Sequence, residues 1–248
     1  MSDFEVIALG VGDSFSERYH PTSLLLRKDG FSLAIDCPDM YRAVLRDASE
    51  KCGERLDLFA IDDVLITHVH GDHMNGLEGV AFFKHFAQKK RLKLIASPEV
   101  REVIWDGRLR ASMGMLYDGK RLEEKTFDEY FDYQPLPWRQ RTHVGPFEIE
   151  TYATKHHVPT SALLVRAAGA TFGYSADTAF DPALIEFLSP ADLIVHETNY
   201  GPAHTPYEQL AALPAELRTR MRLVHYSDLF DLSNLAVEAL REGERLVL

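Results

Sequence analysis

The chain has 248 residues, of which 46% are hydrophobic and 26% are charged, as in an ordinary globular protein. Its 27 basic and 38 acidic side chains give a formal net charge of −11, which argues against a long nucleic acid held through its phosphates. No apolar run approaches the roughly 20 residues that cross a bilayer. The only cysteines are Cys37 and Cys52. We therefore expect a cytoplasmic protein without membrane attachment.

The first hundred residues predict short strands that alternate with helices. Two of these strands form a hairpin that turns at Asp29-Gly30, a strong turn dipeptide. A serine followed by proline at Ser97-Pro98 is a typical helix start. Strands are expected at Phe4–Leu9, Ser23–Arg27, Phe31–Asp36, Val64–Thr67 and Leu92–Ala96, and helices over Leu77–Gln88 and from Ser97 onward.

Residues 101–142 are rich in charged and aromatic side chains and show no clear periodicity. We interpret the chain as a single domain, 1–248, in which this segment is an insertion or a lid over the site. The alternative is that this segment is a surface loop without a catalytic role. Its aromatic residues could stack on a base, or pack in the core or against a second subunit; they are Trp105, Tyr117, Tyr130 and Trp138.

The remaining third of the chain again alternates strands and helices. A helix begins at Asp181-Pro182 and runs to about Leu188, and a closing helix is expected over Leu232–Arg241. Because strands occur in both halves with helices between them, the pattern predicts two packed sheets flanked by helices. The expected strands are Phe147–Thr154, Ala162–Arg166, Thr171–Ser175, Asp192–Glu197 and Leu223–His225.

The most informative motif is the run Thr67-His68-Val69-His70-Gly71-Asp72-His73, which follows a short apolar strand. His68 and His70 alternate and can share one face, while the turn at Gly71 brings Asp72 and His73 round to an adjacent position. Imidazole nitrogens and carboxylate oxygens are the ligands that zinc and similar divalent ions prefer. Three histidines and an aspartate at this spacing predict a metal site.

The pattern HxHxDH after a strand resembles the hallmark of the metallo-β-lactamase superfamily. This resemblance implies an α/β fold, an αββα sandwich of two mixed β-sheets flanked by helices. It also implies later ligands in Thr154–Pro159, in Tyr174–Thr178 and in Leu223–Ser227. By resemblance, one metal ion is held by His68, His70 and His156, the other by Asp72, His73 and His225, and Asp177 bridges the two.

The third histidine ligand is ambiguous, because His156 and His157 are adjacent. The offset to Val158 and the following strand resembles the family better with His156. His157 would then be an exposed neighbour of the metal centre.

A site of this kind explains its own chemistry. Two divalent ions, expected to be Zn²⁺ with Mn²⁺ or Fe²⁺ as alternatives, can hold a bridging water and lower its pKa from about 16 toward about 7. The same cations stabilise charge on oxygen in the transition state. Asp72 is placed to orient or deprotonate that water, so we expect it to be catalytic as well as a ligand.

Three further stretches resemble the ribonuclease Z and phosphodiesterase branch of the superfamily: Leu9–Asp13, Ile35–Cys37 and Ile194–Asn199. The last of these is similar to the branch's HEAT element. By that resemblance His196 is the general acid and Glu197 orients it. The alternative is a buried pair at a strand end that only supports the metal ligands. His204 is a weaker candidate for contact with the substrate.

The substrate is expected to be small. Ribonuclease Z grips transfer RNA with a long arm between its third histidine ligand and its bridging aspartate, whereas only twenty residues separate His156 from Asp177. We therefore expect a small phosphodiester, and the nearest functional analogy is to cyclic-nucleotide phosphodiesterases, including the group that phages use to destroy cyclic nucleotide defence signals. The alternatives are a tRNA 3′-end endoribonuclease and a lactonase or thioesterase. The resemblance further implies a homodimer.

Overall fold

The computed structural model describes residues 4–248, and its first layer is a mixed seven-stranded sheet. Its first four strands in space run antiparallel, and the strands after β3 pair in parallel. In spatial order they are β16 (Arg245–Val247), β1 (Glu5–Gly10), β2 (Ser23–Lys28), β3 (Phe31–Ile35), β4 (Asp63–Leu65), β5 (Leu92–Ala96) and β8 (Phe131–Pro135).

The second layer is another mixed sheet of seven described strands. Strands β9 to β12 run antiparallel, and β12 to β15 run parallel. In spatial order they are β15 (Glu238–Ala239), β14 (Met221–Val224), β13 (Leu193–Glu197), β12 (Ala170–Tyr174), β11 (Ser161–Ala167), β10 (Phe147–Ala153) and β9 (Arg141–Val144).

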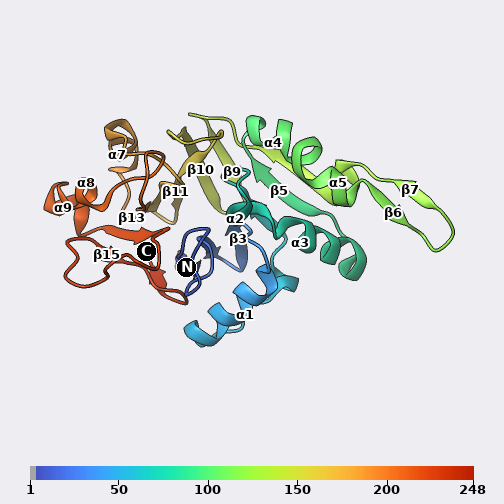
Figure 1. The fold of residues 1–248 in the computed structure, drawn as a ribbon, viewed down its shortest axis with the longest axis horizontal. Helices are drawn as coiled ribbons and strands as arrows, with labels where there is room; N and C mark the ends of the chain where they lie inside the picture. The colour runs from blue at the N-terminus through green and yellow to red at the C-terminus, as the bar shows by residue number, and fades with distance from the viewer. Residues whose placement is uncertain (1–3) are drawn as a thin grey trace.

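The two sheets pack face to face, and helices lie on their outer faces (Figure 1). Strand β1 shows why both faces of the first sheet are apolar: Val6 and Ala8 pack in the core between the sheets, whereas Ile7 and Leu9 pack in the cluster formed with the helices. The predicted αββα sandwich is therefore confirmed. The longer helices are α1 (Tyr41–Cys52), α3 (Leu77–Phe83) and α4 (Pro98–Ile104) on the first sheet, and α7 (Pro182–Leu188) on the second.

Most predicted elements form within a residue or two of their expected bounds. The hairpin between β2 and β3 turns at Asp29 and Gly30, whose φ angles are 51° and 79°, as a tight β-hairpin turn requires. Ser97 caps α4 by accepting a hydrogen bond from the Val100 amide, and Asp181 caps α7 by accepting one from Ala183.

One expected helix does not form, and one helix that forms was not predicted. No closing helix forms over Leu232–Arg241: Asn234 has a φ of 54°, and Asp231 accepts the Ser233 amide in a turn, so the chain cannot enter a helix there. Its end instead adds β15 to the second sheet, beside β14. Conversely, helix α1 was not predicted, although its buried residues Tyr41, Val44, Leu45 and Ala48 have helical spacing.

Residues 101–142 are more regular than expected. Strands β8 and β9 add to the outer edges of the two sheets, and the hairpin of β6 (Met115–Tyr117) and β7 (Leu122–Glu124) projects from the body of the protein (Figure 1). Trp105 and Tyr130 are buried among core residues, whereas Tyr117 is 67% exposed on the hairpin. A role of this segment as a lid stays a prediction. The short helices here are η3 (Trp105–Leu109, π-helical), α5 (Arg110–Met113) and α6 (Phe127–Tyr130).

None of the helices described over residues 4–248 is both long and apolar enough to cross a membrane. Cys37 and Cys52 are free thiols.

Candidate metal centre

The predicted ligands lie where strands of both sheets end. His68 and His70 follow β4, and Asp72 and His73 lie in α2 (Gly71–Met74), the one-turn helix that comes next. His156 lies in the connection from β10 to β11, Asp177 follows β12, and His225 follows β14. The two sheets therefore deliver side chains from four separate stretches of chain to one place.

These side chains form two groups that share one residue. The first group is His68, His70, His156 and Asp177, and the second is Asp72, His73, Asp177 and His225. Within each group the ligand atoms all lie within 4.8 Å of one another. The two groups match the two ligand sets inferred from the resemblance, and Asp177 is common to both.

Of the two adjacent histidines, His156 is the one that joins a group. Its Nε2 lies 3.1 Å from Nδ1 of His70 and 3.7 Å from the Asp177 carboxylate. The Ala203 carbonyl is 3.1 Å from the Nδ1 of His156 and fixes the orientation of the ring. His157 is exposed and stands outside both groups.

The residues present fit divalent ions. Metal binding requires neutral imidazoles and ionised carboxylates. Burial lowers the pKa of His68 well below its usual value and that of His156 to about 4, so both rings are neutral at pH 7. Burial alone would raise the pKa of Asp177, but the surrounding His225 and His73 hold it well below its usual range. His73 Nε2 and Asp177 Oδ1 are buried and face each other at 3.4 Å without a well-aligned hydrogen bond.

Asp36 is a supporting residue that the sequence reasoning did not identify. Its buried carboxylate lies 2.8 Å from Nδ1 of His73 and accepts hydrogen bonds from the backbone amide and hydroxyl of Thr67. It thus fixes the ring of one ligand and the backbone just before another, a role typical of carboxylates behind metal-binding histidines. Its place directly after β3, at the edge where His68 follows β4, was the available signal.

Backbone strain gathers at the same strand ends. Asp36, Ala176 and His225 have φ angles of 62°, 48° and 61°, in the left-handed region that residues other than glycine rarely adopt. Each of them lies one or two residues beyond the end of a strand that leads to the metal centre. Strained residues persist where surrounding structure enforces them, often at functional sites. Here the turn redirects each strand end so that a side chain points into the site.

Glu197 and His204 form a pair beside the two metal groups. Nδ1 of His204 lies 3.0 Å from Oε1 of Glu197, which also accepts the Thr178 amide. The ring of His204 stacks on that of His225 with centroids 5.3 Å apart. Burial raises the pKa of Glu197 to about 7, against the opposing effect of His204. Burial would lower the pKa of His204, but the hydrogen bond and charge of Glu197 raise it.

The structure does not bring His196 into this arrangement. Successive side chains of a strand point to opposite faces, so His196 faces away from the side on which Glu197 meets His204. Its Nδ1 bonds to the backbone carbonyl of Glu197 at 2.7 Å, and burial lowers its pKa to about 4. His196 is therefore a buried neutral ring, and the expected partnership in which Glu197 orients His196 gives way to one between Glu197 and His204.

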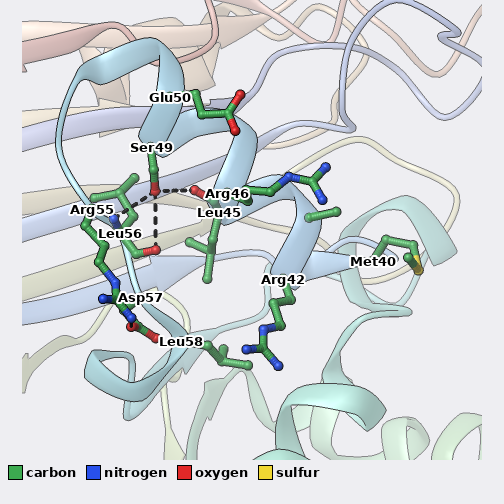
Figure 2. A pocket seen from close by; sticks show the side chains of 11 residues that line it. Met40, Arg42, Leu45, Arg46, Ser49, Glu50, Arg55, Leu56, Asp57 and Leu58 are labelled. Atoms are coloured by element: carbon green, nitrogen blue, oxygen red, sulfur yellow. Dashed lines mark hydrogen bonds and ion pairs between the residues drawn. The ribbon is translucent and has the colours of Figure 1, made fainter.

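A hollow of about 570 Å³ near the start of α1 contains no predicted site residue (Figure 2). Three arginines border it, but they do not converge: Arg42 and Arg46 point in different directions, and Arg55 pairs with Asp57 (Figure 2). Ser49 holds its wall by bonding to the Leu45 carbonyl and the Leu56 backbone. The predicted metal ligands therefore lie together at the strand ends and not in this hollow.

Comparison with known proteins identifies the family of the chain. Residues 4–240 match the family described as anti-Pycsar protein Apyc1. An anti-Pycsar protein Apyc1 from Paenibacillus sp. (strain J14) is 31% identical over 227 residues, covering 89% of this chain and 88% of the relative. Another, from Saccharibacillus brassicae, is 30% identical over 227 residues, with the same coverage.

The fold has solved counterparts. The metallo-β-lactamase fold protein YhfI from Bacillus subtilis superimposes with a TM-score of 0.77 at 18% identity, covering 99% of this chain and 100% of that chain. The family match, the two groups of metal-ligating residues and the fold together show that the chain belongs to the anti-Pycsar protein Apyc1 family and is a metal-dependent phosphodiesterase of the metallo-β-lactamase fold.

Proposed function

We propose that this protein hydrolyses a cyclic mononucleotide, opening its phosphodiester ring to give a nucleoside monophosphate. The observation that carries the proposal is the Glu197–His204 pair beside the two metal groups, in a member of the anti-Pycsar protein Apyc1 family. Such a pair supplies a proton donor, which cleavage of an unactivated sugar–phosphate bond needs.

The metal ions proposed here are two zinc ions, held by the residues of the two groups. When bound, they would supply Lewis-acid stabilisation of the phosphoryl oxygens and a water made acidic enough to attack at neutral pH. Asp72 has a carboxylate 3.4 Å from Nε2 of His73, and its side chain is 12% exposed. It is placed to accept a proton from the attacking water.

His204 is the proposed general acid, in the place first expected for His196. Its Nδ1 is engaged by Glu197, which leaves Nε2 as the ring nitrogen that can face the substrate. Its side chain is 20% exposed, whereas His196 is buried. The departing sugar oxygen can therefore take its proton from His204, while Glu197 stabilises the charged imidazole.

The absence of an RNA-binding arm supports a small substrate. The twenty residues between His156 and Asp177 include β11, a tight turn and β12, and the connecting segments on either side of these strands are at most four residues long. Together with the net charge of −11, this disfavours transfer RNA.

We further propose that the enzyme is a homodimer. The β6–β7 hairpin exposes Met115, Tyr117 and Leu122, which are 50%, 67% and 65% accessible. Apolar side chains gathered on a projecting element are typical of an association surface. Light scattering on a size-exclusion column tests the mass, and Tyr117→Ser combined with Leu122→Ser should shift it toward the monomer.

A hydrolysis screen of the zinc-loaded protein tests the function. It compares cyclic mononucleotides, bis-p-nitrophenyl phosphate, a lactone, a thioester and a precursor tRNA, with products separated by chromatography. We expect turnover of cyclic nucleotides and of the chromogenic diester. Turnover of the lactone or thioester alone, or of the tRNA alone, would refute the proposal.

A further inference from the structure

A small cavity of about 160 Å³ lies between the loop after β13 and the loop after β14. Its wall begins close to three residues of the site: Thr198 directly follows Glu197, and Ser227 is two residues beyond His225. Pro206, also in the wall, is two residues beyond His204. Two residues span at most about 7 Å, so the cavity is within reach of a group attached to a phosphate at the metal centre.

The volume selects what the cavity can hold. Pockets for whole drug-sized ligands enclose about 300–1,000 Å³, so this one suits only a part of a nucleotide. The phosphate belongs at the metal groups. The portion left for the cavity is the base, which is a single planar ring system.

The lining suits a base in its chemistry. Tyr207 and Phe230 meet edge to face with centroids 5.5 Å apart and form an aromatic wall. Tyr200, 64% exposed, stands at the rim, where its ring is available to stack on a planar ligand. Asn199 is held in place because its amide nitrogen donates to the Asp13 carboxylate at 3.0 Å.

One charge in the lining can discriminate between bases. Glu208 is exposed, and its carboxylate only accepts hydrogen bonds. Cytosine and adenine present an exocyclic amino group that donates to such an oxygen, whereas uracil presents a carbonyl oxygen that it repels.

We propose that this cavity is the nucleobase subsite, in which Tyr200 stacks on the base and Glu208 favours bases with an exocyclic amino group over uracil. This inference rests on the proposed function and deepens it, since it names the substrate preference of the same centre.

Steady-state kinetics on cyclic CMP, cyclic UMP and bis-p-nitrophenyl phosphate test it. The variants are Tyr200→Ala, Tyr200→Phe and Glu208→Gln. Matched controls away from the cavity are Phe59→Ala, which removes another aromatic ring that is 52% exposed, and Glu216→Gln, which neutralises another exposed helical glutamate.

We expect the unmodified enzyme to prefer cyclic CMP by about ten-fold in kcat/KM, the size of one hydrogen bond to a charged group. Tyr200→Ala should lower kcat/KM for both cyclic nucleotides by about 5- to 100-fold, mainly through KM, and Tyr200→Phe should restore it. Glu208→Gln should remove the preference. Both control variants should cleave every substrate at the rate of the unmodified enzyme.

Cyclic nucleotides cleaved at unchanged rates by Tyr200→Ala and Glu208→Gln would overturn the subsite while leaving the proposed function intact. An unmodified enzyme that cleaves bis-p-nitrophenyl phosphate but no cyclic nucleotide would instead overturn the proposed function, and the base subsite with it.

Discussion

Replacing His204 by glutamine tests whether this residue donates the proton to the departing sugar oxygen. The change keeps a polar side chain of similar length but removes the titratable ring that lies 3.0 Å from Glu197 and stacks on His225. General acid catalysis contributes about 10²- to 10⁴-fold. At about 1.36 kcal/mol for each factor of ten, this is a barrier increase of roughly 3–5 kcal/mol. The loss applies only where the leaving oxygen needs a proton.

The assay therefore compares two leaving groups. Hydrolysis of a cyclic nucleotide expels a sugar alkoxide, and we expect His204→Gln to lower its kcat by about 10²- to 10⁴-fold. Bis-p-nitrophenyl phosphate expels nitrophenolate, which departs without a proton, so its turnover should fall by less than about ten-fold. Glu197→Gln should show the same selectivity with a smaller loss, because it weakens the orientation and charge of His204 without removing the ring.

Metal content and stability serve as controls. His204→Gln should retain two metal ions by elemental analysis, since His204 belongs to neither ligand group. His196→Gln should lower the free energy of unfolding, because His196 is buried, yet keep the wild-type ratio between the two substrates. Equal losses on both substrates in His204→Gln, or a selective loss only in His196→Gln, would refute the assignment of the acid.

The remaining predictions concern metal content and stability. Asp177→Ala should lose both metal ions and all turnover, because Asp177 is common to both ligand groups. His156→Ala should lose one ion, whereas His157→Ala should keep two. Elemental analysis of the purified variants measures the metal content, and an active, metal-free Asp177→Ala would contradict the bridging role. Gly76→Ala should destabilise the fold by more than about 2 kcal/mol, because its Cβ would meet the Pro38 carbonyl oxygen at 2.1 Å. Gly79→Ala, in helix α3 with open space around it, should stabilise the fold by up to about 1 kcal/mol. Urea denaturation measures both free energies of unfolding, and changes of the same sign in the two variants would disprove the reasoning. Burial alone would raise the pKa of Asp181, but hydrogen bonds from Tyr152, Lys155 and the Ala183 amide lower it, so its contribution to stability is present above its unfolded pKa and is lost as pH falls through the lowered value. Asp181→Asn should therefore be less stable at pH 7 and lose less stability between pH 5 and pH 2, and parallel pH profiles of Tm would contradict this.

The sequence alone determined the features that short stretches encode. Short apolar runs and the turn residues that bound them predicted most strands, because a strand that is buried on both faces is apolar at successive positions. The run from His68 to His73 indicated a metal site because three histidines and an aspartate stand within six residues. The later ligands came from the resemblance to a family, since nothing local connects His156, Asp177 and His225.

The tertiary structure decided what depends on faces and on distant partners. The strand β15, which forms in place of the expected closing helix, depends on pairing with β14 at the edge of the second sheet, and this pairing outweighs local propensity. His196 and Glu197 are neighbours in sequence, yet their side chains point to opposite faces of β13. Only the folded structure shows that the Glu197 side chain is the one that contacts His204 beside the metal ligands. The sequence identified the His196-Glu197 motif, but the alternation of side chains along β13 determined which of the two residues faces the metal ligands.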